Sequence, residues 1–173
     1  MELKNLRLNR HEEKRLQGGH LWIYSNEVNT MTTPLKQFQP GEQVRVESHS
    51  GKFLGTAYVN SHSLICARMF SREPRALDYT LLLHRLEQAL RLRSRLFKEP
   101  FYRLVYGESD LLPGLVVDRF GPHLSVQLNT AGMEVLKSEI VDALKTLLSP
   151  ESILLRNDSS MRHLEGLKQE VET

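Results

Sequence analysis

Residues 42–70 read EQVRVESHSGKFLGTAYVNSHSLICARMF. Apolar and polar residues alternate here with period two, and the alternation stops twice, at residues 49–51 and 61–62, where turn-forming residues gather. Three short strands are therefore predicted. Gly55 stands inside the second strand, where a residue without a side chain typically marks a β-bulge or a tight corner.

The stretch upstream contains further short elements. Its patterns predict a strand, a helix ended by a pair of glycines, and a second strand, at residues 3–8, 10–17 and 21–28. Residues 29–42 are polar and contain a Pro-Gly turn, so a long surface loop is expected there. Several closely spaced short strands with one short helix favour a small closed or half-closed β-barrel across about residues 1–72.

The rest of the chain mixes helical and strand-like patterns. Leucines recur at helical spacing between Asp78 and Phe97, which predicts an amphipathic linking helix within residues 73–100. Beyond it we expect three strands, a second amphipathic helix and a fourth strand, within residues 101–128, at 132–148 and at 152–156. The first three strands predict a small antiparallel sheet, and the whole order predicts a small α+β domain over residues 101–173.

The composition is that of a folded protein with an uneven charge distribution. Of the 173 residues, 40% are hydrophobic and 25% are charged, which is close to the globular average. No apolar run approaches the ~20 residues that cross a bilayer, so a cytoplasmic protein without a membrane partner is expected. The net charge is +3 for residues 1–70, +3 for residues 71–100 and −4 for residues 101–173. The basic first half is compatible with phosphate binding, whereas the acidic second half would repel a polyanion.

Carboxylates that stand close together are the first candidates for catalysis. Glu108 and Asp110 lie two residues apart near a turn, and Asp118 ends a strand beside Arg119. Such acids serve in acid/base catalysis, but exposed turn residues and a structural Asp118–Arg119 ion pair explain them as well. The sequence therefore compels no reaction at these positions.

Metal, nucleotide and cysteine chemistry leave no clear sequence signal. The seven histidines are scattered, and no HExxH, GxGxxG or GxxxxGK[ST] motif occurs. The single cysteine, Cys66, lies in a strand-like run without a neighbouring base, so packing in a core is expected. These observations favour a binding module, without a metal site, over a catalytic one.

The loop GGHLWIYSNEV at residues 18–28, which follows a basic helix, is the strongest candidate for binding. Glycines let a backbone approach its partner, a histidine donates hydrogen bonds, aromatic rings stack on bases and cations reach phosphates. The residues concerned are Lys14, Arg15, Gly18, Gly19, His20, Trp22 and Tyr24. Two alternatives stay open: the glycine pair as a helix C-cap only, and Trp22 as a core residue.

The chain also resembles a known family. The segments RHEEKRLQGGHLWIYSNEV, PGEQVRVESHSGKFLGTAYVN and SLICAR are similar to the N-terminal PUA domain of the bacterial large-subunit rRNA cytosine-5 methyltransferases. YRLVYGESDLLPGLVVDRFG and RNDSSMRHLEGL are similar to the central domain of that family, which precedes a Rossmann-type methyltransferase domain. The most specific piece is GESDLLPGLVVDRFG, because it combines a turn, an acidic pair and a Pro-Gly strand start in one order.

The resemblance implies an enzyme that uses S-adenosylmethionine to methylate carbon 5 of a cytosine in 23S rRNA, with a cysteine as nucleophile. In that family the cofactor loop and this cysteine follow the EGL sequence, whereas this chain ends at Thr173, and Cys66 lies in the PUA-like part. We therefore expect a mixed α/β chain with a PUA-like barrel at 1–72, a linking helix at 73–100 and a small α+β domain at 101–173. The Rossmann-type domain is expected to be absent, so the chain alone would bind no S-adenosylmethionine and be inactive.

The expected function is that of an RNA-binding front part that recruits and orients rRNA for a missing catalytic domain. The alternative is a stand-alone PUA-type RNA-binding protein. By the resemblance, the residues that face large-subunit rRNA are Lys14, Arg15, Gly19, His20 and Asn26, with Arg45 and Lys52 as outlying phosphate contacts. The central region has three open roles: orienting the missing domain, which we favour, lining the RNA cleft, or forming a homodimer through the helix at 132–148.

Overall fold

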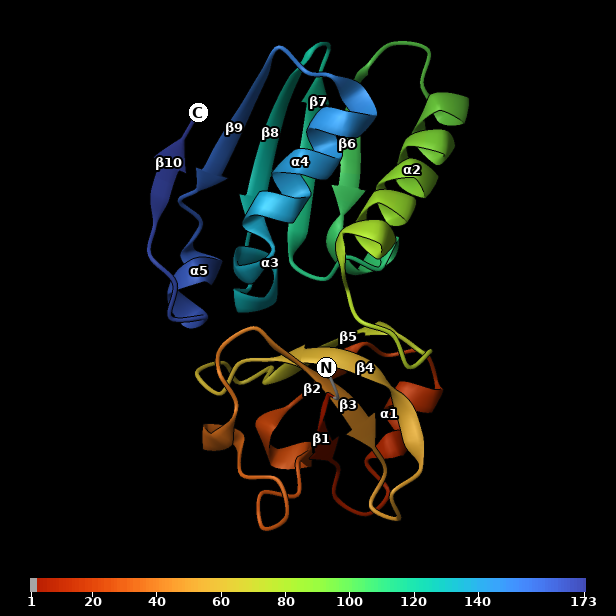
Figure 1. Cartoon of the computed structure of the whole chain (residues 1–173), viewed down its shortest axis with the longest axis vertical. Helices are drawn as coiled ribbons and strands as arrows, with labels where there is room; N and C mark the ends of the chain where they lie inside the picture. The colour runs from red at the N-terminus through yellow and green to blue at the C-terminus, as the bar shows by residue number, and fades with distance from the viewer. Residues whose placement is uncertain (1–2) are drawn as a thin grey trace. The chain divides into compact units, whose positions relative to one another are not determined.

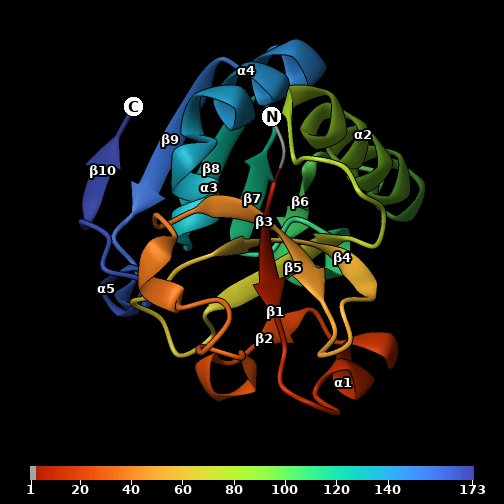
Figure 2. The ribbon, with the colours of Figure 1, turned by 60° about the horizontal axis from the view of Figure 1, so that its bottom comes forward.

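The computed structural model describes residues 3–173, and the chain divides into two compact units. The first unit ends at Ala76 and the second begins at Leu77. Each contains one five-stranded sheet (Figures 1 and 2). Within residues 3–173, no helix combines the length and the apolar character needed to span a membrane.

The sheet of the first unit has the strand order β1-β3-β4-β5-β2. β1 is parallel to β3, and the other neighbours are antiparallel. The elements of this unit are β1 (Lys4–Arg7), α1 (Glu13–Gln17), β2 (Trp22–Ile23), η1 (Ser25–Glu27), η2 (Leu35–Gln37), β3 (Glu42–Glu47), β4 (Phe53–Val59) and β5 (Ala67–Ser71). The three strands predicted between residues 42 and 70 are confirmed.

The predicted β-barrel is wrong. Among the described residues, β1 and β2 are the two edges of an open sheet, and a single bridge, between Leu8 and Val28, joins the segments that follow them. β2 is only two residues long, because Tyr24 starts a tight helical turn in which its N–H donates to the Glu27 carboxylate (2.7 Å). The edge strand therefore ends before it can pair along its length and close a barrel.

A β-bulge lies in β4. The register between β3 and β4 shifts beside Gly55, and the register between β4 and β5 shifts just after it. Gly55 has a φ of 155°, and a Cβ built there would lie 2.3 Å from Met69 Cε and 2.4 Å from the Ser71 carbonyl oxygen. The predicted bulge is confirmed, and only glycine fits this close approach.

The core of the first unit is apolar and draws on every strand of the sheet. It comprises Leu6, Leu8, Leu16, Ile23, Val28, Phe38, Val44, Val46, Leu54, Ala57, Val59, Cys66, Ala67 and Met69.

The sheet of the second unit has the order β10-β9-β8-β7-β6. Its elements are α2 (Tyr79–Leu96), β6 (Phe101–Tyr106), η3 (Gly107–Asp110), β7 (Leu115–Phe120), β8 (His123–Leu128), α3 (Ala131–Val135), α4 (Lys137–Leu148), β9 (Ser152–Asn157), α5 (Ser160–Leu164) and β10 (Glu170–Glu172). The antiparallel arrangement predicted for the first three strands is confirmed for β6, β7 and β8, and β9 lies parallel to β8. The helical connection between them returns the chain to the end of the sheet at which β8 began.

Helices α2 and α4 pack against each other and cover one face of this sheet (Figure 1). Beneath them lie the buried side chains of Leu115, Val117, Leu124, Val126, Leu128 and Leu155. α2 begins after Asp78, whose carboxylate accepts a hydrogen bond from the Leu81 N–H (2.9 Å). The helix predicted as a linker thus packs on α4 and β6 inside the second unit.

The helix predicted at 132–148 is divided in two. Leu136 leaves helical geometry and separates α3 from α4. The buried residues of α4 are Ile140, Ala143 and Leu144, so its apolar stripe already packs within the second unit. A homodimer through this helix stays a prediction.

The polar tail forms α5 and β10, although the sequence shows no core pattern there. The Arg162 side chain is 1% exposed and anchors this segment. Its guanidinium donates to the carbonyl oxygens of Leu128 and Lys168 and pairs with the Glu134 carboxylate (2.8 Å). A buried cation with several acceptors thus replaces apolar packing.

Candidate functional site

Helix α1 and the turn after it position the basic residues and glycines expected to face RNA. Gly18 caps α1, and its N–H donates to the Lys14 carbonyl oxygen (3.0 Å). Gly19 adopts a left-handed conformation (φ 104°), and the His20 N–H donates to the Arg15 carbonyl oxygen (3.1 Å). The glycine pair is therefore a helix C-cap, and the turn leaves Gly19 and His20 exposed.

Arg15 has a structural partner. Its Nη1 lies 2.5 Å from Glu27 Oε1, and its guanidinium lies 5.1 Å from the centre of the Tyr24 ring. Glu27 is 7% exposed, and its other oxygen accepts the Tyr24 N–H. Arg15 thus ties α1 to η1 and neutralises a buried carboxylate, which the sequence did not reveal.

The other polar residues of this segment are more open to solvent. Lys14, His20 and Asn26 are all exposed. Asn9 Nδ2 donates to the carbonyl oxygens of Asn26 (3.1 Å) and Val28 (3.2 Å), which ties η1 to the residues before α1. Residues 9–28 thus form one ordered surface segment, the α1 segment.

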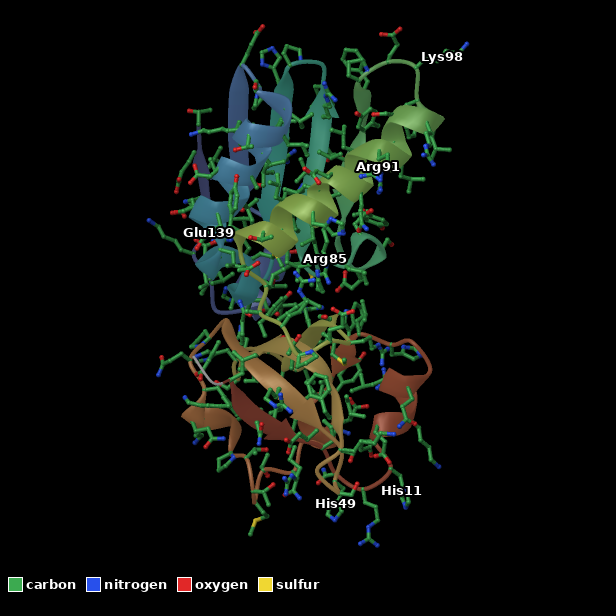
Figure 3. All side chains as sticks on the ribbon, turned by 45° about the vertical axis from the view of Figure 1, so that its right-hand side comes forward. His11, His49, Arg85, Arg91, Lys98 and Glu139 are labelled. Carbon is green, nitrogen blue, oxygen red and sulfur yellow. The ribbon has the colours of Figure 1, made fainter. Side chains whose placement is uncertain are left out.

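Lys52 comes from the β3–β4 turn at residues 48–52. It is exposed, and its N–H donates to Ser48 Oγ (3.1 Å). Figure 3 shows His49 of this turn at the same end of the first unit as His11 of the α1 segment. Both histidines are exposed and add polar groups to this end, which the sequence analysis did not select.

Arg45 belongs to the sheet instead. It lies in β3 between Val44 and Val46, whose side chains are buried on the opposite face. Its guanidinium lies 4.7 Å from the centre of the Phe53 ring. These contacts tie Arg45 to the sheet and not to the α1 segment.

Trp22 is a surface residue of β2. Its side chain is 38% exposed, while the next residue, Ile23, is fully buried. The guanidinium of Arg68, its partner across the strands, lies 5.4 Å from the indole ring. The alternative that Trp22 belongs to the core is therefore wrong.

Asp110 and Asp118, two of the acidic residues considered for catalysis, make structural ion pairs. Asp110 accepts two hydrogen bonds from the Arg93 guanidinium (2.5 and 2.7 Å), and the side chains are 8% and 12% exposed. Asp118 pairs with Arg103 (2.8 Å), which raises the pKa of that guanidinium. The predicted Asp118–Arg119 pair is wrong, because successive residues of a strand point to opposite faces.

Cys66 is buried, as predicted, and its thiol donates weakly to the Ile23 carbonyl oxygen (3.5 Å). Burial raises the pKa of this thiol to about 12. Such a cysteine is a poor nucleophile, because the thiolate is the reactive form. Among residues 3–173, no cluster of three or more His, Cys, Asp or Glu side chains is suited to hold a metal ion.

The chain is similar in sequence to a family of PUA-like domains and to rRNA methyltransferases. Residues 6–72 match the model of a family described as a PUA-like domain. Proteins named ribosomal RNA large subunit methyltransferase I are 37% identical to this chain over 160 residues in Cronobacter sakazakii and 36% identical over 160 residues in Escherichia coli K12. Each match covers 90% of this chain, and the chain spans about 40% of the length of these relatives.

Two solved structures share the fold. One is described as a methyltransferase in complex with SAH, with a TM-score of 0.77, and the other as a SAM-dependent methyltransferase from Streptococcus mutans, with a TM-score of 0.76. Both are 18% identical to this chain and cover 90% of it, while the chain covers 40% and 41% of theirs.

These matches correct two further expectations. The expected fold, in which the Rossmann-type domain is absent from the chain, is wrong. The chain has two mixed sheets with helices, and 90% of it matches methyltransferase structures. Neither a separate recruiting RNA-binding fragment nor a stand-alone PUA-type protein describes the chain, because the similarity extends far beyond residues 6–72. The first unit contains a PUA-like domain, and the chain is homologous over most of its length to large-subunit rRNA methyltransferases.

Proposed function

We propose that this protein methylates large-subunit rRNA with S-adenosylmethionine as methyl donor, at carbon 5 of a cytosine. The observation that carries the proposal is the 37% identity to a large-subunit rRNA methyltransferase over 90% of the chain. The choice of carbon 5 rests on the resemblance of residues 107–121, GESDLLPGLVVDRFG, to the cytosine-5 family.

The first unit contacts the RNA in this proposal. It carries 11 Lys and Arg against 7 Asp and Glu, whereas the second unit carries 12 against 14. Positive charge attracts the phosphate backbone, and glycine turns allow close approach. The contact residues are Lys14, Gly19, His20, Asn26 and Lys52, with Arg45 outlying and Arg15 holding the α1 segment in shape.

The second unit contains a hollow of about 420 Å³ beside α4 and β9. Val141, Ile153 and Leu155 supply apolar lining, and Glu172 is held by the Lys137 ammonium (2.7 Å). Cofactors with an adenosine group bind beyond the carboxyl ends of strands, on glycine-rich loops. This hollow lies near the amino end of β9 and its lining contains no glycine, so it does not fit S-adenosylmethionine.

The proposal is tested in cells by deleting the gene and digesting large-subunit rRNA to nucleosides for mass spectrometry. We expect one 5-methylcytosine per rRNA to disappear and to return when the intact gene is supplied. A second complementation with the gene carrying Lys14→Ala and Lys52→Ala should restore less of it. Unchanged methylation of the rRNA after deletion would contradict the proposal.

A further inference from the structure

Helices α2 and α4 cover one face of the second sheet. On its other face, which we call the open face, three aromatic side chains are largely exposed: Phe101 at 64%, Tyr106 at 58% and Phe120 at 53%. Scattered apolar residues are common on protein surfaces, but several rings gathered on one sheet face mark an interaction site.

Strand register places these rings in an ordered array. Phe101 of β6 lies directly opposite Phe120 of β7, and Phe120 lies opposite His123 of β8. Directly opposed residues of antiparallel strands have Cβ atoms about 4.5–5.5 Å apart, so the two phenyl rings are neighbours. Tyr106 faces Val116 near the other end of the same two strands. The rigid sheet therefore holds aromatic side chains at both ends of the open face.

Cations separate the rings. Arg103 lies between Phe101 and Tyr106 along β6, with its guanidinium 5.2 Å from the centre of the Tyr106 ring, and its side chain is 45% exposed. Arg156 of β9 is 58% exposed. Each arginine has one carboxylate beside it, Asp118 or Asp158, so the open face carries no excess of negative charge.

The acidic groups of β10 lie on the covered face. Glu170 and Glu172 both pair with Lys137 of α4 (3.7 and 2.7 Å), while Val171, between them, points the other way and is 56% exposed. These two carboxylates are thus kept off the open face. A polyanion meets little repulsion there, although the unit as a whole is acidic.

We propose that the open face binds two or three unpaired bases of single-stranded RNA, with Phe101, Phe120 and Tyr106 as stacking platforms. Open sheet faces carrying exposed aromatics are a recurrent way to bind RNA without pairing, because every base presents a flat π-face. The paired Phe101 and Phe120 form the main platform, and Arg103 and Arg156 lie within reach of the sugar-phosphate chain. The inference rests on the proposed function, since it supplies a second contact for the same RNA substrate.

The test uses the chain of residues 1–173 and a fluorescein-labelled, unstructured 15-nucleotide RNA of mixed sequence, followed by fluorescence anisotropy. The double variant Phe101→Ala/Phe120→Ala should lose about 5- to 100-fold in affinity. Phe101→Tyr/Phe120→Tyr should bind like the wild type, whereas Phe101→Leu/Phe120→Leu, which keeps apolar area without a π-face, should bind like the alanine variant. The matched control is Leu92→Ala/Leu96→Ala on α2, which removes side chains that are 51% and 67% exposed and should change nothing.

A duplex of the same RNA separates stacking from backbone attraction. Its affinity should be equal for the wild type and the alanine variant, because paired bases offer no free face. Wild-type binding to the single strand with no loss in the alanine variant, or full retention in the leucine variant, overturns the stacking site and leaves the proposed function standing. No binding of either RNA by the wild type overturns the stacking site, and the gene-deletion experiment then decides the proposed function separately.

Discussion

Replacing Arg15 by alanine should destabilise the first unit more than it weakens RNA binding. The change leaves the Glu27 carboxylate, 7% exposed, with a backbone N–H from Tyr24 as its remaining partner. Removing one partner of a fully buried pair costs about 3–5 kcal/mol, but Arg15 is 40% exposed, so water screens the pair and we expect about 1–3 kcal/mol. For a unit of this size that corresponds to a fall in Tm of about 4–24 °C.

The assay is thermal unfolding followed by circular dichroism, with Lys14→Ala as the matched control. Lys14 is exposed on the same helix, so its removal should cost less than about 0.5 kcal/mol. The double variant Arg15→Met/Glu27→Gln should recover most of the lost stability, because it removes the uncompensated charge. Equal stability of the Arg15 and Lys14 variants would refute the structural role given to Arg15.

Three further predictions concern the fold. Gly55→Ala should destabilise the first unit by about 2 kcal/mol or more in urea unfolding, because its Cβ would clash with a neighbouring strand; a cost under half a kcal/mol would contradict the bulge geometry. Cys66 should resist iodoacetamide at pH 8 in the folded protein and react in urea, since burial raises its thiol pKa to about 12; rapid labelling of the native protein would count against this. The hydrogen bond from Lys137 lowers the pKa of the Glu172 carboxyl group. The stabilisation that this pair gives β10 is therefore fully present above the ordinary pKa of 4.5 and is lost as the pH falls through the lowered pKa. NMR shifts of Glu172 should report that loss below pH 4.5 in the wild type, and Lys137→Met should show it at higher pH.

The sequence predicted those elements that leave a local pattern of apolar and polar residues. Period-two alternation located β3 and β4, helical leucine spacing located α2, and an isolated glycine in a strand located the bulge at Gly55. Each of these signals is local, because side-chain direction follows directly from backbone period.

Features that depend on distant partners escaped prediction. The barrel prediction was wrong because the Glu27 carboxylate accepts a hydrogen bond from the Tyr24 N–H, and the resulting turn shortens β2. A single sequence does not reveal such a hydrogen bond. Asp118 was paired with its neighbour Arg119, whereas the strand directs it to Arg103 across the sheet. The tail shows no core pattern in the sequence, because its buried anchor, Arg162, is a cation and looks polar in any hydropathy pattern.

Only part of the candidate site has a local sequence signal, for the same reason, and its RNA-binding role stays a prediction. The glycine turn, Lys14 and His20 stand out locally and do lie on one surface segment, whereas the role of Arg15 depends on a buried acid twelve residues away. The aromatic residues of the open face were visible in the sequence only as strand formers. Their exposure follows from the packing of α2 and α4 on the opposite face of the sheet (Figure 1).

The most direct test of the central claim is the salt dependence of binding between residues 1–173 and a large-subunit rRNA fragment. Affinities of the wild type and of Lys14→Ala/Lys52→Ala are measured at several salt concentrations. Each lost phosphate contact lowers the slope of log affinity against log salt by about 0.7–0.9, so the double variant should bind more weakly with a slope reduced by about 1.5. An identical slope and affinity in the two proteins would contradict the assignment of the first unit as the RNA-contacting surface.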